Sequence, residues 1–105
     1  MIILKENKKP TVFNEDQLTI NNLIKYYNKV PLTLAKYYPF GYGKGGAYVE
    51  FHNAMFLIDG NSMTIDQKDA YLMLKISSIS TISTPTETQI VIALKERSSL
   101  YLYLK

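Results

Sequence analysis

The sequence predicts an α+β fold in which one or two N-terminal helices pack on an antiparallel sheet of about five strands, arranged as a meander. Three observations lead to this prediction. Hydrophobic residues recur at helical spacing in the first 40 residues, they alternate with polar residues after Gly46, and a glycine-rich segment at 41–46 separates the two regions. Helices followed by strands are typical of an α+β domain, and 105 residues suit a single domain spanning 1–105.

The helical region begins with a capping signal. Asn14 is a suitable N-cap, and the acidic residues after it would complement the helix dipole, so a helix is expected from Glu15 to about Asn28. Its apolar positions are Leu18, Leu23, Ile24 and Tyr27. Pro31 prevents simple continuation but suits the first position of a second short helix, which Pro39 would end. A short strand is also possible at Ile2–Leu4.

The first strands of the sheet are expected on either side of a tight turn. Residues 47–51 and 55–58 would pair through a hairpin at His52-Asn53, and Gly60-Asn61 would end the second strand. Residues 64–68 fit either a short helix or a loop.

The later strands are predicted from alternation. They cover 70–82, with a break at Pro85, then the region of Ile90, Ile92 and Leu94, and finally 100–104 after a turn at 96–99. In the last strand the leucines at 100, 102 and 104 should face the core, and Tyr101 and Tyr103 should face outward.

Composition bounds the class of protein. The chain is 47% hydrophobic, contains no cysteine and carries a net charge of +3 from twelve basic and nine acidic residues. A disulfide framework and a thiolate metal site are therefore excluded, and neither a signal peptide nor a membrane-spanning run is recognisable, so a cytoplasmic protein without membrane contact is expected. Abundant Ile, Lys, Asn and Tyr, all with A/T-rich codons, favour a viral or low-GC archaeal or bacterial origin.

Basic and aromatic residues are interleaved in a window without negative charge. No acidic residue occurs between Asp16 and Glu50. Lysines can contact phosphates and aromatic rings can stack on unpaired bases, so the window predicts binding of single-stranded DNA or RNA. The predicted site consists of Lys25, Lys29, Lys36, Tyr37, Tyr42, Lys44 and Tyr48.

Residues 44–51, KGGAYVEF, resemble the RNP1 motif of RNA recognition motif domains. The resemblance implies that Tyr48 stacks on a base and that Lys44 contacts a phosphate. The segment departs from the motif at Gly46, where the family has an aromatic residue, and chance similarity is the alternative.

Two other functions stay open. The C-terminal strand has two outward tyrosines among basic residues and could be an edge strand that binds a protein partner. The partner would be a second copy of the chain, or a host protein if the chain is a viral-type inhibitor. This basic-aromatic set is Lys95, Arg97, Tyr101, Tyr103 and Lys105. A metal-dependent nuclease is the weaker alternative, since the chain has one histidine and no compact carboxylate cluster; no catalytic residue, metal ligand or cofactor is assigned. Its candidates would be Glu50, His52, Asp59, Asp66 and Asp69.

Overall fold

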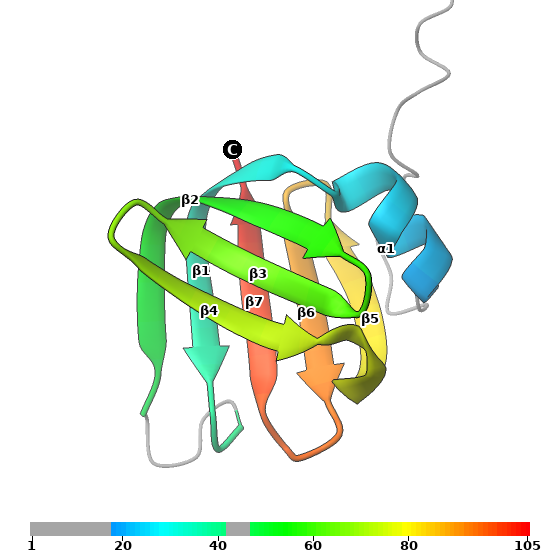
Figure 1. Ribbon diagram of the computed structural model, residues 1–105. Coiled ribbons are helices and arrows are strands. Elements are labelled where there is room, and N and C mark those ends of the chain that lie inside the picture. The colour runs from blue at the N-terminus through cyan, green and yellow to red at the C-terminus, as the bar shows by residue number, and fades with distance from the viewer. Residues whose placement is uncertain (1–17, 42–46) are drawn as a thin grey trace, which may run out of the picture.

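The computed structural model describes residues 18–41 and 47–105. Within them the chain forms one antiparallel sheet of seven strands, curled into a half-barrel, and one short helix, α1 (Ile20–Tyr27), at its side (Figure 1). The strands are β1 (Val30–Tyr38), β2 (Val49–Asp59), β3 (Ser62–Gln67), β4 (Ala70–Lys75), β5 (Ile79–Thr86), β6 (Gln89–Leu94) and β7 (Ser99–Leu104). A 3-10 turn, η2 (Ile76–Ser78), joins β4 to β5.

Two meanders make up the sheet. The strands lie in the order β4-β3-β2-β1-β7-β6-β5, and every pair is antiparallel. Strands β1 to β4 form the first meander and β5 to β7 the second. The last strand, β7, pairs with β1 and so joins the two into one surface.

The predicted α+β fold of helices on a five-stranded sheet is therefore wrong. Only the first helix exists in the described part of the chain, and the segment predicted as a second helix after Pro31 is the central strand β1. Valine, threonine and tyrosine in this segment suit a strand, and the proline lies near the strand's start, where its missing N–H is tolerated. The predicted cap Asn14 and the strand at Ile2–Leu4 lie outside the described residues.

The predicted hairpin at His52-Asn53 is also wrong, because β2 runs through both residues. Asn53 adopts a left-handed conformation with φ 53°, and the buried residues on either side, Phe51 and Ala54, are three apart instead of two. The pairing of β2 with β1 nevertheless keeps one register from Val49 to Phe56, so Asn53 interrupts the alternation of buried positions without ending the strand. The ambiguous segment 64–68 lies mostly in β3, and the strand predicted over 70–82 is divided by η2.

The alternation in the last two strands is confirmed. Ile90, Ile92 and Leu94 of β6 are buried, as are Leu100 and Leu102 of β7. Tyr101 and Tyr103 lie between these buried leucines and are partly exposed on the opposite face.

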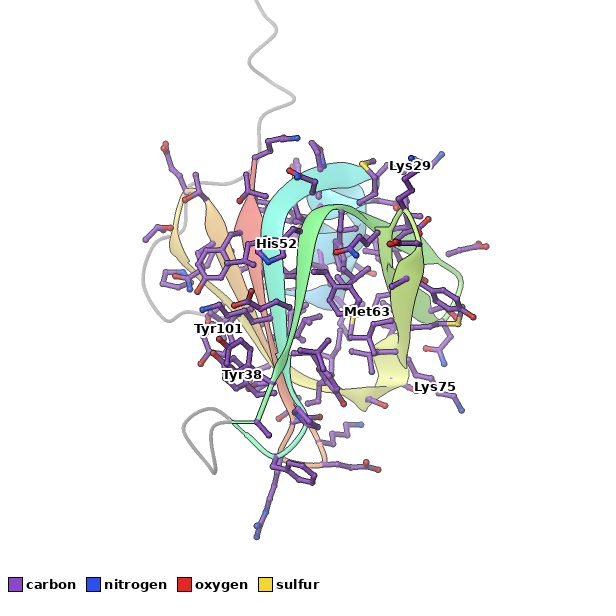
Figure 2. The ribbon with its side chains drawn as sticks, turned by 90° about the vertical axis from the view of Figure 1, so that its left-hand side faces the viewer. Lys29, Tyr38, His52, Met63, Lys75 and Tyr101 are labelled. Carbon is purple, nitrogen blue, oxygen red and sulfur yellow. The ribbon has the colours of Figure 1, made fainter. Side chains whose placement is uncertain are left out.

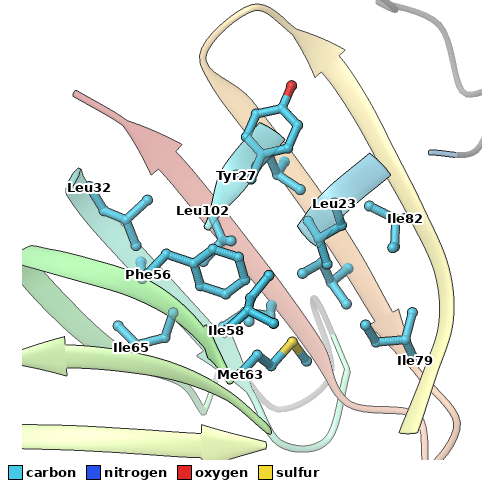
Figure 3. Packing of buried hydrophobic residues seen from close by; sticks show 14 of the residues in the cluster. Leu23, Tyr27, Leu32, Phe56, Ile58, Met63, Ile65, Ile79, Ile82 and Leu102 are labelled. Carbon is cyan, nitrogen blue, oxygen red and sulfur yellow. The ribbon is translucent and has the colours of Figure 1, made fainter. Parts of the chain in front are cut away.

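Helix α1 lies at the side of the half-barrel and packs against its core (Figure 1). Its buried residues Leu23 and Tyr27 pack in the same cluster as Phe56 from the first meander and Ile82 and Leu102 from the second (Figure 3). The core therefore contains side chains from both meanders and from the helix.

Both ends of α1 are fixed by side-chain hydrogen bonds. The helix begins after Thr19, whose hydroxyl accepts a hydrogen bond from the Asn22 amide at 3.1 Å. After its last turn, Asn28 accepts a hydrogen bond from the Ile58 amide at 2.8 Å, which ties the helix to β2.

Candidate nucleic-acid interface

Three tyrosines meet on the outer, convex face of the sheet. The rings of Tyr38 and Tyr48 stack with centroids 5.0 Å apart, and Tyr101 meets Tyr38 edge-on at 5.4 Å. These residues, Tyr38, Tyr48 and Tyr101, are called the outer tyrosine cluster below. Figure 2 shows Tyr38 and Tyr101 side by side on this face.

Strand register brings the cluster together. Lys36 of β1 lies opposite Tyr101 of β7 on one side and Glu50 of β2 on the other. Because alternate residues share a face, Tyr38, two residues after Lys36, lies on the outer face as well. Tyr48 immediately precedes β2 and reaches the same end of β1, where Tyr37 pairs with Val49.

One lysine adds positive charge to the cluster. The ammonium group of Lys36 lies 5.4 Å from the centroid of the Tyr48 ring, within the range of a cation–π contact. Tyr48 is 44% exposed, whereas Tyr38 is only 7% exposed because its neighbours cover it. Tyr48 therefore offers a ring that can stack on a ligand, and Tyr38 supports it from below.

A hydrogen-bonded acid–histidine pair borders the cluster. The Nε2–H of His52 donates to Oε1 of Glu50 at 2.9 Å, on the outer face of β2. This hydrogen bond lowers the pKa of the Glu50 carboxyl, and a hydrogen bond from Tyr48 and the charge of Lys36 lower the pKa further. Glu50 therefore stays ionised and partly offsets the positive charge of Lys36.

The predicted nucleic-acid site is not a single surface in the described residues. Lys36 and Tyr48 lie together on the outer face, but Tyr37 is partly buried and packs against the core. Lys25 lies in the last turn of α1 and Lys29 in the turn after it. Figure 2 shows Lys29 well apart from the tyrosines at 38 and 101. Tyr42 and Lys44 lie outside the described residues.

The C-terminal basic-aromatic set is also divided. Lys95 and Arg97 lie in the turn between β6 and β7, at the end of β7 that pairs with Tyr38. Lys105 lies beyond the other end of that strand, near Pro31, whose carbonyl accepts from its amide at 3.2 Å. The prediction that β7 is an edge strand is wrong, because β1 and β6 flank it on both sides.

Sequence reasoning left Tyr38 and Tyr101 out of the predicted site. The outward direction of Tyr101 follows from alternation in β7, and Tyr38 belongs to the basic-aromatic window. Their contact depends on the pairing of β1 with β7, two strands more than 60 residues apart in the sequence. No local pattern indicates that pairing.

The candidates for metal chemistry do not gather in the described structure. Glu50 and His52 form a pair, but Asp59 lies at the far end of β2, and Asp66 and Asp69 belong to β3 and the turn that follows it. Among residues 18–41 and 47–105 there is no group of three or more His, Cys, Asp or Glu side chains able to hold a metal ion.

No family model, curated protein or solved structure matches this chain. The resemblance to RNP1 does not extend to the fold, since β2 continues past Phe51 to Asp59 and turns into β3, whereas a helix follows this strand in that family. The one α-helix in the described ranges is too short to cross a membrane.

Proposed function

We propose that this protein binds single-stranded nucleic acid on the outer face of β1, β2 and β7. The observation that carries the proposal is the lysine at position 36 beside the outer tyrosine cluster. An exposed ring gives a base a stacking surface whatever its sequence, and the adjacent ammonium group gives the backbone a phosphate contact. The proposal therefore implies little sequence preference and a marked dependence on salt.

Further basic residues support a path for the strand. Lys95 and Arg97 occupy the turn that precedes β7, and Ser99 at the start of β7 pairs with Tyr38. Phe40, 67% exposed, follows the same end of β1. A single strand lying over the cluster would thus have cations and a second exposed ring within reach at this end of the sheet.

Binding can be measured with a labelled single-stranded oligonucleotide at several salt concentrations. Lys36→Glu should weaken binding and reduce the slope of log K against log salt by about 0.7, the value for one lost phosphate contact on a single strand. Glu50→Gln should strengthen binding, because it removes a negative charge beside the same cluster. Lys29→Glu makes the same change of charge as Lys36→Glu but lies far from the cluster, so it should change affinity far less.

The role of the ring can be tested at one position. Tyr48→Leu should lower affinity by roughly tenfold, since stacking contributes about 1–3 kcal/mol per base, whereas Tyr48→Phe keeps the ring and should retain most of the affinity. Equal losses in the two Tyr48 variants would show that stacking is not the source of binding. No binding of the unaltered chain at low salt to single-stranded DNA or RNA would overturn the proposal.

A protein-interaction function is a second candidate, carried by a different observation. The edge strand β4 exposes large apolar side chains, with Tyr71 66% and Met73 56% exposed. In the described residues β4 has no partner strand on its outer side, and large apolar side chains on such an open edge suit a protein partner better than a polyanion.

A further inference from the structure

The edge formed by β4 lacks the usual protection against strand pairing. In the described residues β4 has a neighbour on one side only, β3, and it pairs with β3 over six residues without a register shift. It contains no proline or glycine, and none of its residues is buried. Proteins normally blunt such edges with prolines, bulges or covering segments.

The other edge of the sheet, β5, has this protection. The Leu18 amide donates to the Ile82 carbonyl at 2.8 Å, so a preceding segment covers part of it. Pro85 lies in the strand, and the pairing with β6 shifts register twice. The same molecule thus blocks one edge and leaves β4 open within its described part.

The hydrogen-bonding pattern between β3 and β4 shows which backbone groups of β4 face away from β3. The Ile76 amide donates to the Asn61 carbonyl at 2.8 Å, in line with the register of β3 and β4. In an antiparallel ladder the bonded pairs alternate, so Leu72 and Leu74 direct their backbone groups toward β3. Tyr71, Met73 and Lys75 therefore direct their amide and carbonyl groups to the open edge.

The outward residues are self-complementary in one register. If two copies of β4 run antiparallel about a two-fold axis at Leu72, Tyr71 lies opposite Met73 of the second copy, and Lys75 lies beside the second copy's Asp69. The symmetry repeats both contacts. Thioether–aromatic and opposite-charge contacts are both favourable, and in this register Tyr71 and Met73 present their backbone groups to the other strand.

We infer that two copies of this chain form a two-fold dimer by antiparallel pairing of their β4 strands in this register. The dimer joins the two sheets into one and brings the exposed side chains of Tyr71 and Met73 from the two copies into contact. Asp69, in the turn just before β4, and Lys75, at the end of β4, set the register, since a shift by two residues would separate these opposite charges.

A single engineered cysteine tests the register. The chain has no cysteine, and Leu72 would lie directly opposite its own copy in a non-hydrogen-bonded pair, with Cα atoms about 4.5 Å apart. Leu72→Cys should therefore form a disulfide dimer rapidly on mild oxidation. Ala70→Cys is the control, because the two copies of residue 70 would lie about 14 Å apart and should cross-link far more slowly.

A charge exchange tests the same register without oxidation. Asp69→Lys and Lys75→Asp should each raise the dimer Kd, measured by sedimentation equilibrium, by roughly tenfold through like-charge contact, and the double exchange should restore it. Met73→Pro, which removes one outward amide, should also weaken the dimer and leave the monomer folded. A full chain that stays monomeric, a dimer unaffected by single exchanges, or equal cross-linking at residues 70 and 72 would overturn the inference.

Discussion

At the scale of single residues, the environment of an aromatic side chain decides what it does. Tyr27 and Tyr48 come from the same basic-aromatic window, yet the first is 3% exposed in the core and the second is 44% exposed on the outer face. The basic-aromatic window thus contributes tyrosines both to the core and to the surface, and composition alone does not show which tyrosine is buried.

Burial of Tyr27 has a consequence for stability at high pH. Burial disfavours the charged phenolate and raises the pKa of this side chain above its ordinary value of about 10. Because the folded-state pKa is the higher one, the stabilisation is complete below about pH 10 and is lost as pH rises through the folded-state pKa.

We therefore expect Tyr27→Phe to flatten the alkaline loss of stability. Urea unfolding at several pH values between about 7 and 11 should give a difference in unfolding free energy between the two proteins that is constant up to about pH 9. Above that pH the unaltered chain should lose stability relative to the phenylalanine variant. A difference that stays constant throughout would show that the Tyr27 phenol titrates normally.

At the scale of elements, local irregularities explain which predictions were wrong. The buried residues of β1, Leu32, Ala35 and Tyr38, are three apart, a spacing typical of a helix. It arises because the pairing with β7 shifts register between Leu32 and Leu34 and because the outer tyrosine cluster buries Tyr38. In β2 the left-handed conformation of Asn53 also interrupts the alternation of buried positions, and the pair His52-Asn53 was interpreted as a turn. Regular strands such as β6 and β7 were predicted correctly because strict alternation has no competing interpretation.

The short helix depends on its cap. Helix α1 has only eight residues, too few to be stable alone, and the Thr19 hydroxyl holds the amide of Asn22. Thr19→Ala should lower the unfolding free energy by about 1 kcal/mol, whereas Thr19→Ser keeps the acceptor and should be nearly neutral. Chemical denaturation checks both, and equal losses would assign the effect to the lost methyl group instead of the cap.

At the scale of the whole molecule, the sheet depends on one long-range pairing. Strand β1 has β2 on one side and β7 on the other, so it connects the two meanders and positions Tyr38 beside Tyr101. The strands of the second meander could be predicted individually, but their partners could not, because the pattern of a strand does not say which strand lies next to it. The order of the strands in the sheet and the outer tyrosine cluster were both missed for this reason.

Central and peripheral strands should consequently differ in local stability. Strand β1 is hydrogen-bonded on both sides and contributes Leu32 and Ala35 to the core, whereas β4 is bonded on one side within residues 18–41 and 47–105 and has no buried residue. Amides of β1 and β7 should exchange with solvent only through global unfolding, and those of β4 through local opening at lower free energy.

Native-state hydrogen exchange, followed by NMR at increasing denaturant, measures this difference directly. In a dilute monomeric sample we expect the Tyr71 and Met73 amides to exchange fastest within β4 and the Leu72 and Leu74 amides more slowly, because only the latter pair with β3. Raising the protein concentration should protect Tyr71 and Met73 selectively if β4 pairs with a second copy. Equal protection of β1 and β4 in the monomer would show that the sheet opens as one unit and that the open edge is not its weakest part.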